Sequence, residues 1–135
     1  MAGSANTPVQ GYPQPMGSKI RMIFDHNGPK SYANIGTSSG QGDTINATDL
    51  GYGGFDGVDT TMGVGNYSSS GNYIVIIGVS ASATTQTVNP AAGLATPKIV
   101  LRWMTTSAAF GAISTEVTNA TDLSAEVMRF DATMV

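Results

Sequence analysis

Apolar and polar residues alternate in short runs along the chain, and this pattern predicts strands rather than long helices. Residues 98–105 carry Ile, Leu and Trp at every second position, and residues 126–134 alternate in the same way. Residues 72–79 are instead almost continuously apolar and largely β-branched, which is typical of a strand buried on both faces. The clearest strands therefore lie in the second half of the sequence.

Shorter strands are expected in the first half, between turns rich in Gly, Asn and Pro. Residues 19–24 form the first, and the turn formers of residues 25–29 end it. Further candidate strands are residues 31–35, 44–46 and 58–64. Helices are expected only as single turns at residues 106–113 and 121–124, because no long window repeats apolar positions with a helical period.

About eight short strands separated by such turns predict an all-β fold, a β-sandwich of the jelly-roll type. The chain has 17 Gly and only 7% aromatic residues, so its core is expected to be modest. The expected core members come from the three clearest strands: Ile74, Ile76, Ile99, Leu101, Trp103, Val127 and Phe130.

Residues 1–18 are expected to form an extended N-terminal arm, outside a single sandwich domain of residues 19–135. The arm contains three of the six prolines and no charged side chain. Proline fixes φ and lacks an N–H group, so we predict an extended and poorly paired segment. Two interpretations stay open: a loose terminus, or an arm that contacts a neighbouring subunit through Val9, Tyr12 and Met16.

Composition and charge exclude several classes of protein. The absence of Cys excludes a disulfide scaffold and a thiolate zinc site, and a single His excludes a multi-histidine metal site within one chain. The net charge is −3, and no Lys or Arg lies between Lys30 and Lys98, so nucleic acid is not an expected partner. The apolar run of residues 74–79 is too short to span a membrane, and the N-terminus lacks the pattern of a signal peptide.

The residues that most often carry chemistry give no recognisable motif. His26 follows Asp25 and precedes a turn sequence, so a general base is conceivable, but we interpret it as a turn residue. No Gly-x-Ser-x-Gly motif accompanies it. We therefore expect a protein that is not an enzyme, with no catalytic residues.

The carboxylates likewise match no binding motif. Asp49, Asp56 and Asp59 lie in a Gly-rich stretch but lack the alternating ligand spacing of a calcium loop. Glu116 and Glu126 fall on separate segments, so a glycosidase pair is unsupported. We expect no cofactor and no metal site.

Two further features allow a binding role as well as a structural one. Tyr52, Phe55, Tyr67 and Tyr73 cluster in the middle third, where they form either a packed strand edge, which we favour, or a platform for sugars. The pentapeptide Asn-Ala-Thr-Asp-Leu occurs at residues 46–50 and again at 119–123. We interpret it as one turn used twice rather than as a duplicated binding loop.

Several runs of the sequence resemble small virion proteins of tailed bacteriophages. The resemblance lies in residues 98–103, 116–124 and 127–130, with similar pieces at residues 31–33, 42–45 and 49–51. It implies a capsid decoration (cement) protein, a β-sandwich that binds the outer surface of an icosahedral shell and stabilises it.

The resemblance also implies partners and a location. The partners would be the major capsid protein and further copies of the chain, as a homodimer or homotrimer, on the virion surface after synthesis in the host cytoplasm. Two alternatives stay open: a small tail, connector or fibre-associated structural protein, and a lectin-like module that binds glycans.

Overall fold

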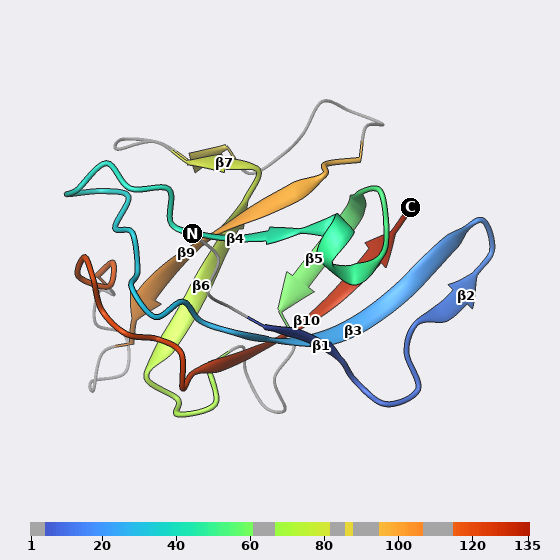
Figure 1. The fold of residues 1–135 in the computed structure, drawn as a ribbon, viewed down its shortest axis with the longest axis horizontal. Coiled ribbons are helices and arrows are strands. Elements are labelled where there is room, and N and C mark those ends of the chain that lie inside the picture. Colours follow the sequence, from blue (N-terminus) through green and yellow to red (C-terminus); the bar gives the residue numbers. More distant parts are fainter. Residues whose placement is uncertain (1–4, 61–66, 82–85, 88–94, 107–114) are drawn as a thin grey trace.

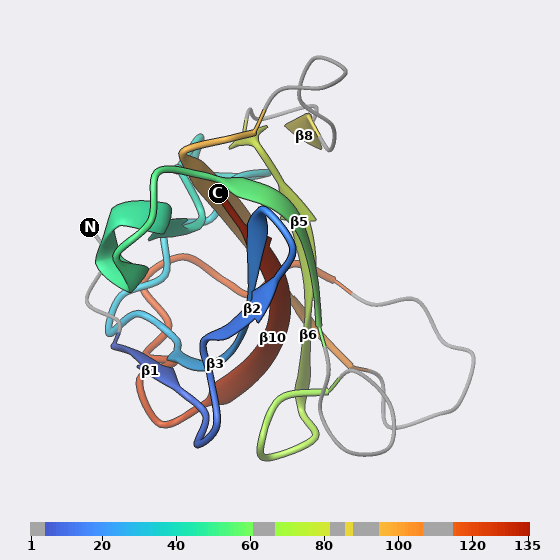
Figure 2. The ribbon, with the colours of Figure 1, turned by 90° about the vertical axis from the view of Figure 1, so that its right-hand side faces the viewer.

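The computed structural model describes residues 5–60, 67–81, 86–87, 95–106 and 115–135. These residues form two antiparallel sheets that enclose one core, and a separate pair of short strands (Figures 1 and 2). Within these ranges the helical structure is a short 3-10 helix, and no helix is long and apolar enough to cross a membrane. The predicted all-β, sandwich-like fold is confirmed.

The larger sheet has the strand order β1-β3-β10-β5, with β2 also paired to β3, and the smaller sheet has the order β4-β9-β6. The larger sheet consists of β1 (Asn6–Pro8), β2 (Gln14–Met16), β3 (Lys19–Asn27), β5 (Phe55–Thr60) and β10 (Val127–Met134). The smaller sheet consists of β4 (Asp43–Asn46), β6 (Tyr73–Gly78) and β9 (Lys98–Thr105). The remaining elements are the 3-10 helix η1 (Ala47–Leu50) and the pair β7 (Ser80–Ala81) and β8 (Gln86–Thr87).

β3 and β10 form the centre of the larger sheet. Every second side chain along β10 is buried, as the alternation in its sequence predicts. Phe24 lies opposite Phe130, and their rings stack with centroids 5.4 Å apart. β3 continues into the predicted turn at residues 25–29, because Asp25 lies opposite Arg129 and forms an ion pair with it.

The core contains four of its seven predicted members. Ile99, Leu101, Trp103 and Phe130 are at most 1% exposed. Val127 is only half-buried, because the inward face of β10 consists of Met128 and every second residue after it.

β6 is not buried on both faces, so the prediction for its core residues is wrong. Val75 lies opposite Trp103 and packs against the core. The alternation of a strand then turns Ile74 and Ile76 to the outer face of the smaller sheet, and Ile76 is 43% exposed. A continuous apolar run does not show which face is inward, and the register with β9 decides it.

The first strands correct the prediction of a poorly paired arm at residues 1–18. β1 and β2 follow one another along β3 and together form an edge of the larger sheet (Figure 1). Val9 donates its N–H to the Ile23 carbonyl (2.8 Å), so Pro8, one position earlier, faces away from β3 and needs no donor. An edge position without an N–H group also resists pairing with another chain.

Four of the weaker predictions fail or lie partly outside the described residues. Residues 31–35 form a loop rather than a strand, although Tyr32 and Ile35 are fully buried within it. Residues 121–124 form no helical turn. Residues 61–64 of one predicted strand and 107–113 of one predicted helical turn lie outside the described ranges.

The repeated pentapeptide adopts two different conformations, so the interpretation as one turn used twice is wrong. Its first copy begins at the last residue of β4 and forms η1, which ends at Gly51 with φ +87°. In the second copy Ala120 has φ +66° and donates its N–H to the Tyr32 carbonyl (2.8 Å). Long-range bonds therefore determine the conformation of the second copy.

Candidate functional site

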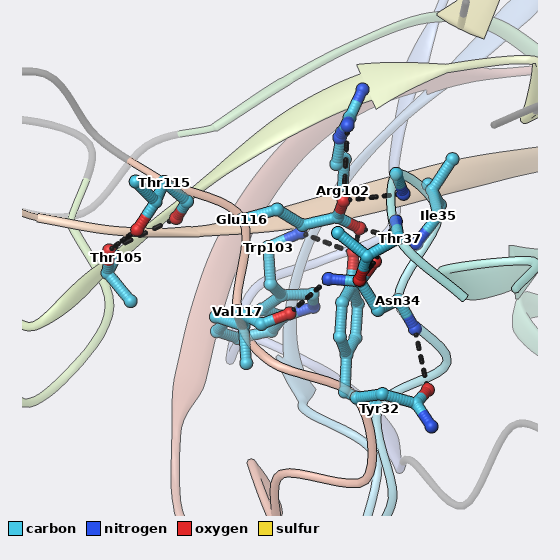
Figure 3. Close-up of polar contacts among 12 residues, drawn as sticks. Tyr32, Asn34, Ile35, Thr37, Arg102, Trp103, Thr105, Thr115, Glu116 and Val117 are labelled. Carbon is cyan, nitrogen blue, oxygen red and sulfur yellow. Dashed lines mark hydrogen bonds and ion pairs between the residues drawn. The ribbon is translucent and has the colours of Figure 1, made fainter. Parts of the chain in front are cut away.

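Glu116 lies at the centre of a network of hydrogen bonds beside β9 (Figure 3). Its Oε2 accepts hydrogen bonds from the Tyr32 hydroxyl (2.8 Å) and the Ile35 N–H (2.6 Å). Its Oε1 accepts from the Gly36 N–H (2.8 Å) and from Arg102 (3.1 Å). The Glu116 side chain is only 8% exposed, and four donors occupy its two oxygens.

The Tyr32 hydroxyl completes the edge of the smaller sheet. β4 pairs with β9 only as far as Leu101, and Val117 donates its N–H to the Trp103 carbonyl (3.0 Å). Between these contacts the Trp103 N–H donates to the Tyr32 hydroxyl (3.1 Å), which in turn donates to Glu116. One buried tyrosine thus satisfies a backbone donor that neither neighbouring segment reaches.

The loop that carries Tyr32 is fixed at a second point by Asn34. The Asn34 side-chain amide donates to the Val117 carbonyl (2.7 Å), and its oxygen accepts from the Thr37 N–H (2.7 Å). Gly36 packs so closely that a Cβ atom there would lie 2.8 Å from Arg102. These contacts hold the loop that carries Tyr32 against β9 and the segment of Val117.

The hydrogen bonds and charges of this network stabilise the ionised form of the Glu116 carboxylate. Burial raises the pKa of Glu116, but the N–H groups of Ile35 and Gly36, the Tyr32 hydroxyl and Arg102 outweigh it and hold the pKa below its usual 4.5. Burial and the hydrogen bond to Glu116 raise the pKa of Tyr32 above its usual range. This shift is opposite to the one that a general acid needs.

His26 belongs to a second buried network that joins the two sheets, so its interpretation as a turn residue is wrong. It lies in β3 and is fully buried. Its Nδ1 lies 2.7 Å from Asn6 Oδ1, and its Nε2 lies 2.6 Å from Asp43 Oδ2 in β4. The Trp103 indole N–H donates to the same oxygen of Asp43 (3.1 Å). The three side chains therefore link β3, β4 and β9 through the core.

The other carboxylates are distributed along the sheets. Arg21 forms two hydrogen bonds to Asp131 on the outer face of the larger sheet, and Lys19 binds Asp56 nearby. Glu126 accepts hydrogen bonds from the hydroxyls of two serines, far along the chain from the partners of Glu116. In the part of the chain that the structure describes, no three His, Asp or Glu side chains gather as metal ligands do.

Three of the four aromatic residues of the middle third pack against the core, in line with the favoured interpretation. Phe55 is buried, and Tyr52 and Tyr73 pack against the core. Tyr73 meets Trp103 edge to face, with ring centroids 6.0 Å apart. Only Tyr67 of the four is strongly exposed, at 46%, so they do not form one platform for sugars.

The three residues predicted to contact a neighbouring subunit differ in the exposure of their side chains. Val9 is half-buried, and Tyr12 packs against the core with Arg21 5.8 Å above its ring. Met16 is 46% exposed at the edge of the larger sheet. A contact of this segment with another subunit stays a prediction, and Met16 is the residue most available for it.

Sequence reasoning did not find the roles of Tyr32, Asn34 and Asp43. None of them belongs to a motif, and the long-range partners that their side chains bind lie 17 to 84 positions away in the chain. Comparisons of the chain with protein-family models, with curated proteins and with solved structures found no match.

Proposed function

We propose that the chain is a structural virion protein that binds the outer surface of a phage capsid and stabilises the shell. The observation that carries this proposal is the use of the buried ionisable groups. Glu116, His26 and Asp43 each bond to two or more other segments and hold loops and sheets together. Buried ionisable groups whose hydrogen bonds join segments of the fold support a rigid binding protein rather than an active site.

The character of the surface supports the same proposal. One edge of the larger sheet is formed by β1 and β2, where prolines remove backbone donors, which suits a protein packed in many copies at high local concentration. The resemblance to small virion proteins implies that the surface it would bind is the shell. A second copy of the chain and the major capsid protein remain the proposed partners.

The number of copies in each virion tests this proposal against its nearest alternative. A decoration protein covers a shell and is present in hundreds of copies, whereas a connector forms one closed ring of about a dozen subunits. Quantitative mass spectrometry of purified virions, scaled to the major capsid protein, gives the ratio. From this ratio we expect hundreds of copies in each virion, and about a dozen copies would favour the connector.

A further inference from the structure

A shallow hollow of about 320 Å³ lies on the outer face of the larger sheet, over β10 and β5. Gly57 lies opposite Thr133 at this place, and a Cβ atom at Gly57 would meet nothing within 4 Å. The missing side chain leaves the space open. Met16, Arg21, Asp59 and Asp131 line the rest of the hollow.

The hollow carries one carboxylate that no basic side chain of this chain neutralises. Asp131 is held by two hydrogen bonds from Arg21. Asp59 lies directly opposite Asp131 on the neighbouring strand, where side chains of one face stand about 5 Å apart and like charges repel. The hydrogen bond found at the Asp59 carboxylate comes from the N–H of Thr60.

All six basic residues of the chain lie in the described ranges, so the structure shows which carboxylates they pair with. Four of them pair with other carboxylates, in the ion pairs Lys19–Asp56, Arg21–Asp131, Arg102–Glu116 and Arg129–Asp25. Lys30 and Lys98 form no ion pair with Asp59. The hollow therefore has an excess of one negative charge beside an exposed apolar side chain, Met16.

We propose that this hollow binds a basic side chain, Lys or Arg, presented by a partner protein. The cationic end would face Asp59 and Asp131, and the apolar stem would lie against Met16. Arg21 on the same rim makes a bare divalent cation a poorer fit than a cation carried on an apolar stem. The identity of the partner rests on the proposed function, but the chemistry of the site does not.

The test uses the full chain and a small probe, Nα-acetyl-arginine amide, with Nα-acetyl-norleucine amide as the uncharged control. Amide signals in ¹⁵N–¹H NMR spectra report where each probe binds. We expect the arginine probe to shift the signals of Gly57, Asp59 and Thr133 and the norleucine probe to leave them in place. Both a failure to shift these signals and an equal response to the two probes overturn the proposal.

Two matched variants test whether the Asp59 carboxylate binds the arginine probe. Asp59→Asn should weaken binding of the arginine probe about fivefold, the size expected of one exposed ion pair, and Asp49→Asn should not change it. Asp59→Asn is also expected to keep the fold, since it removes a like-charge pair. Equal binding by Asp59→Asn and the unchanged protein overturns the site, as does a stronger response of the same signals to calcium chloride alone. Because no shell takes part, a failure of the proposed function leaves this result unaffected.

Discussion

Trp103→Ala is expected to lower the free energy of unfolding by about 3–5 kcal/mol, as for other fully buried aromatic residues. The side chain is 0% exposed and meets Tyr73 edge to face. Its indole N–H also donates to Asp43 Oδ2, which would keep only His26 as a side-chain partner after the substitution. Urea denaturation followed by circular dichroism measures the change.

Trp103→Phe separates the packing of the ring from the hydrogen bond. Phenylalanine keeps most of the buried surface but removes the donor to Asp43, so we expect a smaller loss of about 1–3 kcal/mol. A loss below about 1 kcal/mol for Trp103→Ala would contradict the placement of β9 in the core. Equal losses for the two variants would assign the whole effect to the hydrogen bond.

Glu116→Gln is expected to destabilise the protein by about 2–3 kcal/mol at pH 7, because charged hydrogen bonds are stronger than neutral ones. Gln retains one acceptor oxygen. Its amide nitrogen is itself a donor and would face the donors that bind the other carboxylate oxygen of Glu116. The matched control is Glu126→Gln, whose carboxylate accepts chiefly from serine hydroxyls. We expect a smaller loss for this control in the same denaturation experiment.

The difference between Glu116→Gln and the unchanged protein should also depend on pH. The pKa of Glu116 in the folded state lies below its usual 4.5, so the unfolded chain takes up the proton first as the pH falls. The stabilisation is therefore complete above about pH 5.5 and declines as the pH falls through the folded-state pKa. Denaturation curves at pH 7 and pH 3 should show the difference shrinking, and a difference that grows at pH 3 would contradict the network in Figure 3.

The strands with strict alternation were predictable because their own side chains determine which face is buried. β9 and β10 lie within a residue of their predicted bounds. β6 has nearly the predicted bounds but turns only one face, that of Val75, to the core. Ile74, Val75 and Ile76 are equally apolar, and only the pairing with β9 separates them. Periodicity therefore predicted the faces where it was strict and failed where every residue was apolar.

The N-terminal strands were missed because proline content was taken as evidence against pairing. Pro8 and Pro15 both lie in strands at the edge of a sheet, where an N–H group is not needed. His26 was missed for a related reason: Asp, His and Asn favour turns as single residues, but here Asp43 and Asn6 supply partners for the imidazole. In each case a long-range contact overrides the local preference.

The candidate site could not be predicted for the same physical reason. Tyr32 and Glu116 are 84 positions apart, and neither has a neighbour in sequence that marks its role. The excess charge in the hollow likewise depends on the register that places Asp59 opposite Asp131. Contacts between residues this far apart in sequence depend on the strand pairing and loop positions of the folded protein.

The most direct test of the proposed function is to add the purified chain to undecorated capsids of the phage that this proposal would assign it to. Bound protein is measured by sedimentation with the shells, and shell stability by their melting temperature. The proposed function predicts saturable binding at a fixed ratio to the major capsid protein, together with a higher melting temperature of the shells. Absence of the chain from the sedimented shells, at concentrations well above those in the infected cell, would contradict it.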